Sequence, residues 1–238
     1  KKWVGDAESI TGKSANFKIK GGGKEISFNL LAGEEPSTKD TKLPVYDLEG
    51  KPIEYTITEE EIEGFTAYAT TKTVTLTNDI NMPANKSVTF TNTKMLDPNK
   101  PFTVYKTWLG KSAGSVSFGL FADEKSEPEE TIRLTAENAQ VVANNQNVWT
   151  GKFTKELPEY KLDKEGKPVK ISYVVKELNE KGEPVENEGT VKFGDRTYKL
   201  ESNSVAENNT FNFTNTDITL YNPCRLSMCW NFRLNEDG

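Results

Sequence analysis

Three polar residues in the second half of the chain share a strand face with apolar neighbours. Lys106 lies in PFTVYKTW, Glu177 ends ISYVVKE and Asn215 lies in FNFTNT. Residues two apart in a β-strand point to the same side of the sheet, so all three side chains are expected to face the core. Lysine and glutamate are seldom fully buried, and each residue taken alone would be read as a strand end that reaches solvent.

The same three residue types recur in the same order in the first half of the chain. Lys1 lies in KKWVGD, Glu59 closes EYTITE and Asn92 lies in VTFTNT. A lysine, a glutamate and an asparagine at equivalent positions in both halves favour the interpretation that the three meet in each core.

A lysine, a glutamate and an asparagine that meet in a core can react with one another. Burial disfavours the charged forms, so the lysine tends to lose a proton and the glutamate to gain one. A neutral amine is a nucleophile, and a protonated carboxyl can polarise the carboxamide and carry protons. Attack on the carboxamide carbon would expel ammonia and leave an isopeptide bond. The chain would then be its own single-turnover substrate rather than an enzyme.

An internal repeat explains why the three types occur twice. KKWVGD recurs as KTWLGK, LPVYDLEGKPIEYTITE recurs as LPEYKLDKEGKPVKISYVVKE, and VTFTNT recurs as FNFTNT. Three blocks in the same order predict two homologous domains, residues 1–97 and 98–217, joined near MLDPNKP. Short alternating runs separated by EGKP turns predict a β-sandwich in each domain, with at most a helical turn around residues 135–140.

These blocks resemble the B-type repeat domains of the collagen adhesin family. The resemblance implies an all-β fold of two tandem Ig-like sandwiches of the CnaB, or reverse-Ig, type. It also implies an autocatalytic isopeptide bond in each domain: Lys1 to Asn92 assisted by Glu59, and Lys106 to Asn215 assisted by Glu177. Since the given sequence begins inside a predicted strand, we expect a fragment whose first domain has a truncated N-terminal strand.

The family resemblance implies a structural stalk in a Gram-positive surface adhesin or pilus subunit, secreted and anchored to the cell wall. Such a chain would be a monomer or part of a covalent pilus. The alternative is an adhesive module whose loops bind a host matrix protein or a glycan. A conventional enzyme is disfavoured because the chain has no histidine and no cysteine before its tail.

Composition restricts the partners further. A net charge of −6 disfavours binding to nucleic acid or to an anionic membrane surface. The sequence shows no apolar span, so no membrane insertion is expected of this fragment. The acidic DLEG and DKEG turns lack the alternating ligands of a calcium loop, and we expect neither a metal nor a cofactor.

The tail, residues 218–238, has no counterpart in the repeat. It contains both cysteines, Cys224 and Cys229, which are a candidate disulfide pair. It also reads as a selected peptide, as vector-encoded sequence or as frame-shifted sequence. We expect a non-native extension, and the functional interpretation does not rest on it.

Overall fold

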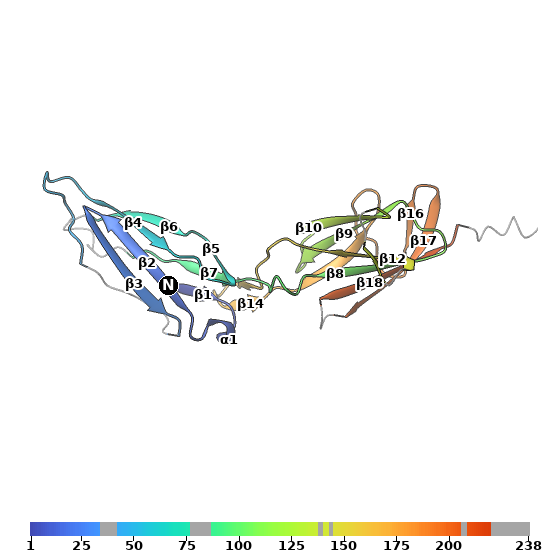
Figure 1. Ribbon diagram of the computed structural model, residues 1–238, viewed down its shortest axis with the longest axis horizontal. Coiled ribbons are helices and arrows are strands. Elements are labelled where there is room, and N and C mark those ends of the chain that lie inside the picture. Colours follow the sequence, from blue (N-terminus) through green and yellow to red (C-terminus); the bar gives the residue numbers. More distant parts are fainter. Residues whose placement is uncertain (34–41, 77–86, 138–139, 143–144, 206–208, 220–238) are drawn as a thin grey trace, which may run out of the picture. The chain divides into compact units, whose positions relative to one another are not determined.

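The computed structural model describes residues 1–33, 42–76, 87–137, 140–142, 145–205 and 209–219. Strands dominate this part of the chain, which contains a single helix of four residues (Figure 1). The predicted all-β fold class is therefore confirmed. The candidate disulfide, Cys224 with Cys229, lies outside the described residues.

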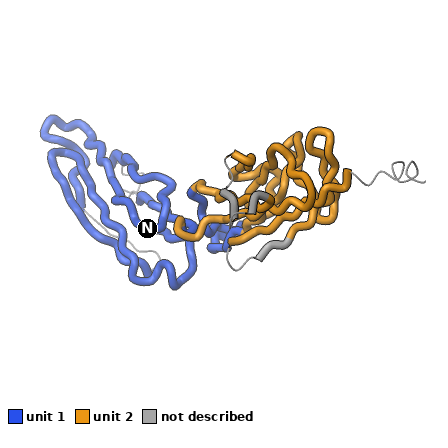
Figure 2. The backbone as a smooth tube through the Cα atoms, turned by 45° about the vertical axis from the view of Figure 1, so that its right-hand side comes forward, with its two compact units in different colours: residues 1–97, 156–171 blue, residues 98–155, 172–238 orange. Residues whose placement is uncertain are grey.

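The chain divides into two compact units, which Figure 2 colours separately. The first comprises Lys1–Asp97 and Glu156–Ile171, and the second comprises Pro98–Lys155 and Ser172–Gly238. Residues 156–171 thus lie in the first unit, although in the sequence they are part of the second repeat.

The first unit is a sandwich of two sheets, with strand orders β1-β7-β5 and β3-β2-β4-β6. A separate two-stranded hairpin, β13-β14, accompanies them. The strands are β1 (Lys2–Val4), β2 (Ser14–Gly21), β3 (Lys24–Leu31), β4 (Glu54–Glu59), β5 (Phe65–Ala67), β6 (Thr71–Thr75), β7 (Thr91–Lys94), β13 (Tyr160–Leu162) and β14 (Pro168–Lys170).

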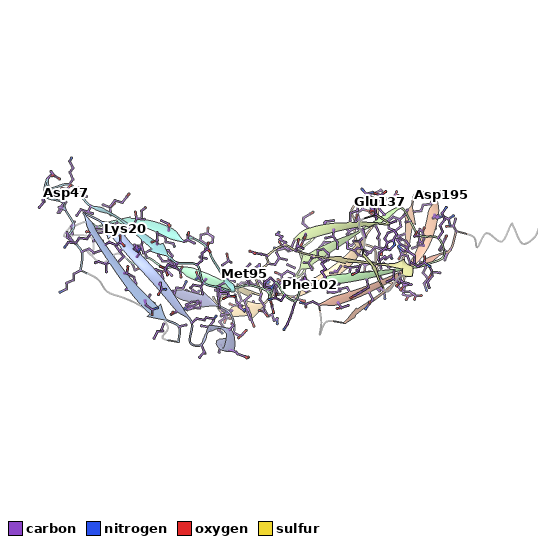
Figure 3. The ribbon with its side chains drawn as sticks, viewed as in Figure 1. Lys20, Asp47, Met95, Phe102, Glu137 and Asp195 are labelled. Carbon is purple, nitrogen blue, oxygen red and sulfur yellow. The ribbon has the colours of Figure 1, made fainter. Side chains whose placement is uncertain are left out.

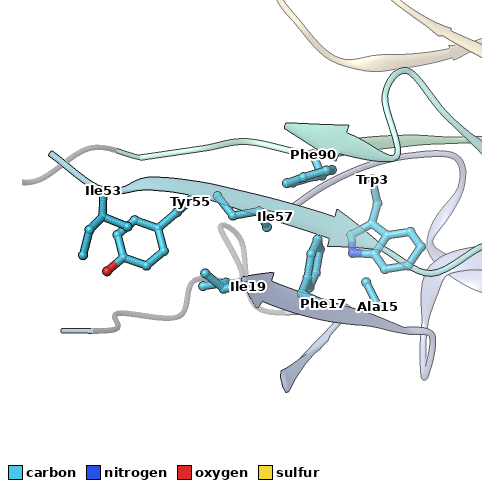
Figure 4. Packing of buried hydrophobic residues seen from close by; sticks show 8 residues of the cluster. All are labelled: Trp3, Ala15, Phe17, Ile19, Ile53, Tyr55, Ile57 and Phe90. Atoms are coloured by element: carbon cyan, nitrogen blue, oxygen red, sulfur yellow. The ribbon is translucent and has the colours of Figure 1, made fainter. Parts of the chain in front are cut away.

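Alternating residues of both sheets fill the core of this unit. In β2, Ala15, Phe17 and Ile19 are buried while their neighbours face outward, as a period of two requires. Trp3 of β1 and Phe90, which directly precedes β7, belong to the same buried cluster, which Figure 4 shows. Side chains in β2 therefore alternate between core and solvent, as the prediction of inward-facing polar residues requires.

The turns and the helix follow local side-chain chemistry. Asp47, labelled in Figure 3, accepts backbone hydrogen bonds from Glu49 and Lys51, and Gly50 adopts a φ of +77°. These contacts are those of a tight turn. The helix α1 (Ala7–Ile10) begins after Asp6, whose side chain accepts a hydrogen bond from the Ser9 amide at 2.7 Å.

The described residues of 135–140, where the sequence allowed a helical turn, contain no helix. Thr135 ends strand β10, residues 136–137 form a turn, and Gln140 begins β11. Thr135 is in register with Ser115 and Gln140 with Thr150, so sheet ladders flank the turn on both sides. Residues 138–139 lie outside the described residues.

The second unit contains a sheet of order β11-β12-β8-β18-β17-β16 and a sheet of order β10-β9-β15. Phe118 of β9 and Phe213 of β18 meet between them, with ring centroids 4.9 Å apart. The strands are β8 (Thr103–Leu109), β9 (Ser115–Ala122), β10 (Glu130–Thr135), β11 (Gln140–Val142), β12 (Asn145–Lys152), β15 (Tyr173–Leu178), β16 (Thr190–Phe193), β17 (Arg196–Val205) and β18 (Thr210–Asp217).

No helix in the described ranges is long and apolar enough to cross a membrane.

Candidate functional site

The second unit brings Lys106, Glu177 and Asn215 together from three strands. Lys106 lies on β8 and Asn215 on the adjacent parallel strand β18, where Lys106 is in register with Phe213 and Trp108 with Asn215. The lysine and the asparagine are therefore diagonal neighbours on one face. Glu177 reaches them from β15 in the other sheet.

Glu177 bridges the other two side chains. Lys106 Nζ donates to Glu177 Oε2 at 2.7 Å, and Asn215 Nδ2 donates to Glu177 Oε1 at 2.7 Å. All three residues are 0% exposed. An ion pair without water around it depends on such complete pairing, because each unpaired buried charge is strongly unfavourable.

The first unit repeats the arrangement with one difference. Lys1 Nζ pairs with Glu59 Oε1, and Asn92 Nδ2 donates to the same oxygen at 3.0 Å. The other carboxylate oxygen, Glu59 Oε2, has no hydrogen-bond partner within the described part of the chain. Lys1, Glu59 and Asn92 are 8%, 5% and 2% exposed as whole residues, but the side chains of Lys1 and Glu59 are 0% exposed, as are those of Lys106 and Glu177.

Burial makes both lysines weaker bases than usual. Loss of solvent lowers the pKa of Lys106 to about 8, although the nearby Glu177 carboxylate opposes the change. The pKa of Lys1 is also lowered by burial, against the same kind of opposition from Glu59. A lysine of lowered pKa supplies more of the neutral, nucleophilic amine at a given pH.

One tryptophan ring lies against each lysine. The indole of Trp108 lies 4.8 Å from Lys106 Nζ, and that of Trp3 lies 4.7 Å from Lys1 Nζ. Trp108 in turn packs edge-on against Trp149 and Tyr198. Sequence reasoning did not identify these two residues as part of the site, although Tyr198 stands in an alternating run, RTYKLES, that could have indicated it.

The carboxamide of each asparagine is held on its nitrogen side alone. Asn92 Oδ1 and Asn215 Oδ1 are buried, and neither accepts a hydrogen bond from the residues that the structure describes. Since Nδ2 is the atom that bonds the glutamate, the carboxyl group contacts both the amine and the nitrogen that would leave on attack. The arrangement can therefore carry a proton between these two nitrogens.

A metal centre has no candidate ligands in the described ranges, which contain no group of three or more histidine, cysteine, aspartate or glutamate residues that could hold an ion.

Comparisons with known proteins agree with the family resemblance seen in the sequence. Residues 1–79 match the family model for the Cna protein B-type domain. The chain is 30% identical over 199 residues to the collagen adhesin of Staphylococcus aureus, which is 74% of this chain and 14% of the adhesin. The chain thus spans a small part of the length of this curated relative.

Solved structures give a further likeness. A single B repeat unit (B1) of the collagen binding surface protein of Staphylococcus aureus is 20% identical, with 90% of this chain and 94% of that one covered and a TM-score of 0.30. The pilus adhesin SpaC of Lactobacillus rhamnosus GG is 11% identical, with 91% and 27% covered and a TM-score of 0.26. Because both TM-scores are low, the family assignment rests on the family model and the curated relative instead. On those two matches, residues 1–79 belong to the Cna protein B-type domain family, and the chain resembles the collagen adhesin over 74% of its length.

Proposed function

We propose that the chain is part of the stalk of a Gram-positive surface adhesin or pilus subunit and that each unit closes its own Lys–Asn isopeptide bond. The bonds would join Lys1 to Asn92 and Lys106 to Asn215. The observation that carries the proposal is the bridge made by Glu177, which contacts the amine and the carboxamide nitrogen in a site without solvent.

The reaction in the second unit follows from these contacts. A proton passes from the Lys106 ammonium to Glu177 Oε2, which leaves a neutral amine and a neutral carboxyl. The amine nitrogen attacks Asn215 Cγ and forms the new C–N bond. The old bond to Nδ2 breaks, one amine proton is transferred through the carboxyl group to Nδ2, and ammonia departs. Glu177 ends as the neutral carboxyl formed in the first step, having acted as base toward the amine and as acid toward the leaving nitrogen.

The rigid core supplies the rate. Groups held in reacting geometry behave as if present at roughly 10⁵ M or more, which explains how an unactivated carboxamide can react without a cofactor. The first unit would use Lys1, Glu59 and Asn92 in the same roles. In this proposal the chain turns over once per site and acts on no separate substrate.

A stalk is the function that such bonds serve best. Each bond would tie the first strand of a repeat to the strand that carries its asparagine, so tension would bypass the strands between them. We place the chain outside the cell, held at the wall through the remainder of a longer protein. Contact with host matrix protein or glycan would then belong to other parts of that protein.

Intact mass tests the proposal directly. We expect the purified chain to be lighter than its sequence by two molecules of ammonia, one for each bond. Lys106→Ala and Glu177→Gln should each restore one ammonia, because they remove the nucleophile and the proton carrier of the second site. Lys176→Ala, which changes a partly exposed lysine on the same strand as Glu177, is the matched control and should show both losses. A wild-type chain of full computed mass would refute the proposal.

The lowered pKa of Lys106 predicts a pH dependence in a chain that keeps this lysine. Asn215→Ala removes the electrophile but leaves the Lys106–Glu177 pair. Because the folded pKa of Lys106 is about 8 and the ordinary value is 10.5, the unfolded chain binds more protons between these values. The free energy of unfolding should therefore rise from pH 8 to about 9.5, below the range in which tyrosines ionise.

Denaturant titrations across this pH range measure the effect. The double variant Lys106→Met/Asn215→Ala has no amine at this site and should lack the rise. If the free energy of unfolding changes with pH equally in the two variants, the lowered pKa of Lys106 is contradicted.

A further inference from the structure

A tyrosine hydroxyl anchors the residue that lies five positions after each reactive lysine. In the second unit, Tyr198 donates its hydroxyl to the backbone carbonyl of Lys111 at 3.0 Å. In the first unit, Tyr160 donates to Oδ2 of Asp6 at 2.6 Å. Both anchored residues directly follow the glycine that ends the lysine-bearing segment, Gly5 or Gly110.

The two tyrosines come from different places in the fold. Tyr198 of β17 is in register with Asp217, two residues after Asn215, and Phe65 of β5 is in register with Lys94, two residues after Asn92. Phe65 is thus the structural counterpart of Tyr198. Each ring packs edge-on against the tryptophan of its site, with centroids 5.3 Å apart for Phe65 and 5.2 Å for Tyr198. Phe65 has no hydroxyl to donate.

The hairpin β13-β14 supplies the hydroxyl that Phe65 lacks. The Glu159 amide donates to the Lys94 carbonyl at 2.8 Å, and the Leu96 amide donates to the Leu157 carbonyl at 2.9 Å. These bonds fix the start of the hairpin to the end of β7, and β13 also contacts β1. The bond to Asp6 raises the pKa of Tyr160 to about 12, so the hydroxyl keeps its proton at neutral pH.

Side-chain burial shows that the hairpin covers the outward face of β1. Val4 follows Trp3 and points away from the core, yet it is only 2% exposed. Leu109, its counterpart after Trp108, is 51% exposed. Val4 and Thr93 line a hollow together with Lys161 and Leu162 of β13.

Strand β1 needs this support more than β8 does. It has three residues and, among the described strands, pairs only with β7, whereas β8 has seven and pairs with both β12 and β18. A short strand held by one parallel ladder is weakly fixed. Movement of β1 would carry Lys1 away from Asn92, and a displacement of about 1 Å can slow a reaction about 100-fold.

We propose that Tyr160 and Tyr198 are positioning residues for bond formation, each fixing the lysine strand of one site through its hydroxyl. This role rests on the proposed function, since it concerns the rate at which the two bonds form. It also makes the first bond depend on a residue that the second repeat contributes in sequence.

The two sites of one chain provide internal controls for a test. The chain is made in a cell-free pulse, chased at a temperature where both units are folded, and sampled over time. Proteolysis and mass spectrometry then quantify the Lys1–Asn92 and Lys106–Asn215 cross-linked peptides separately. We expect Tyr160→Phe to slow the first bond about ten-fold or more and to leave the second unchanged, and Tyr198→Phe to do the reverse.

A conservative pair of variants separates the hydrogen bond from general destabilisation. Asp6→Asn keeps an acceptor for Tyr160 and a good helix N-cap, so the first bond should form within about two-fold of the normal rate. Asp6→Ala should slow it as Tyr160→Phe does. If both bonds form but Tyr160→Phe leaves the ratio of their rates unchanged, the positioning role is refuted. If the unsubstituted chain forms neither bond, the proposed function fails, and the positioning role fails with it.

Discussion

Replacing Lys106 with Met and Glu177 with Gln is expected to lower the free energy of unfolding of the second unit by about 4–5 kcal/mol. A bond between Lys106 and Asn215 closes a loop of about 110 residues, and a cross-link of that span restricts the unfolded chain by roughly this amount. For a unit of this size the midpoint of thermal unfolding should fall by roughly 15–25 °C.

The double variant is preferable to either single change. Lys106→Met alone would leave Glu177 buried without its cation, and Glu177→Gln alone would leave the lysine without its anion. An orphaned buried charge is itself strongly destabilising and would be confused with loss of the bond. Together the two changes remove both charges, and the amide oxygen of the introduced glutamine can still accept from Asn215.

Calorimetry or denaturant unfolding measures the change, and the first unit supplies the control. Lys1→Met/Glu59→Gln should lower the stability of the first unit and leave the transition of the second in place. Asn215→Ala, which removes the bond from its other end, should lose a comparable amount. A double variant that melts within a few degrees of the unsubstituted chain would show that no bond had formed.

Strand periodicity explains why much of the site was predictable. Lys106, Trp108 and Asn215 stand in runs whose apolar residues alternate, and alternation fixes which face each side chain takes once the run is a strand. The same alternation predicted that Glu59 and Glu177 would face the core, and both are buried. These residues are local features of single strands.

Other contacts depend on how strands from distant parts of the chain pack, and sequence periodicity does not report packing. Nothing in the sequence indicated that Lys1 and Asn92 would share one oxygen of Glu59 while Lys106 and Asn215 take separate oxygens of Glu177. The segment LPEYKL gave no sign that its hairpin covers β1. Its similarity to LPVYDL placed it in the second repeat, whereas in the structure it lies in the first unit. The strand registers, which the sequence does not give, show that Phe65 occupies the position that Tyr198 occupies in the second unit.

The second unit should not lengthen when it is pulled from its ends. Force enters along β8 near Lys106 and leaves along β18 near Asn215, so the proposed bond transmits it directly between the two strands. In the Lys106→Met/Glu177→Gln variant the strands can separate, and unfolding releases the roughly 94 residues between them that belong to the second unit, since residues 156–171 lie in the first. At about 3.3–3.6 Å per residue, each unfolding event should add roughly 310–340 Å of contour length.

Single-molecule pulling of the chain between marker domains measures this extension. The unsubstituted chain should show the steps of the markers alone, because its first unit is protected in the same way by Lys1 and Asn92. The variant should add one step of the stated length, and Lys1→Met/Glu59→Gln should add one of similar size, since its loop has about 92 residues. Lys176→Ala should behave as the unsubstituted chain. An unsubstituted chain that extends by the full step would show that tension passes through the strands of the sandwich, and a stalk role based on internal bonds would be untenable.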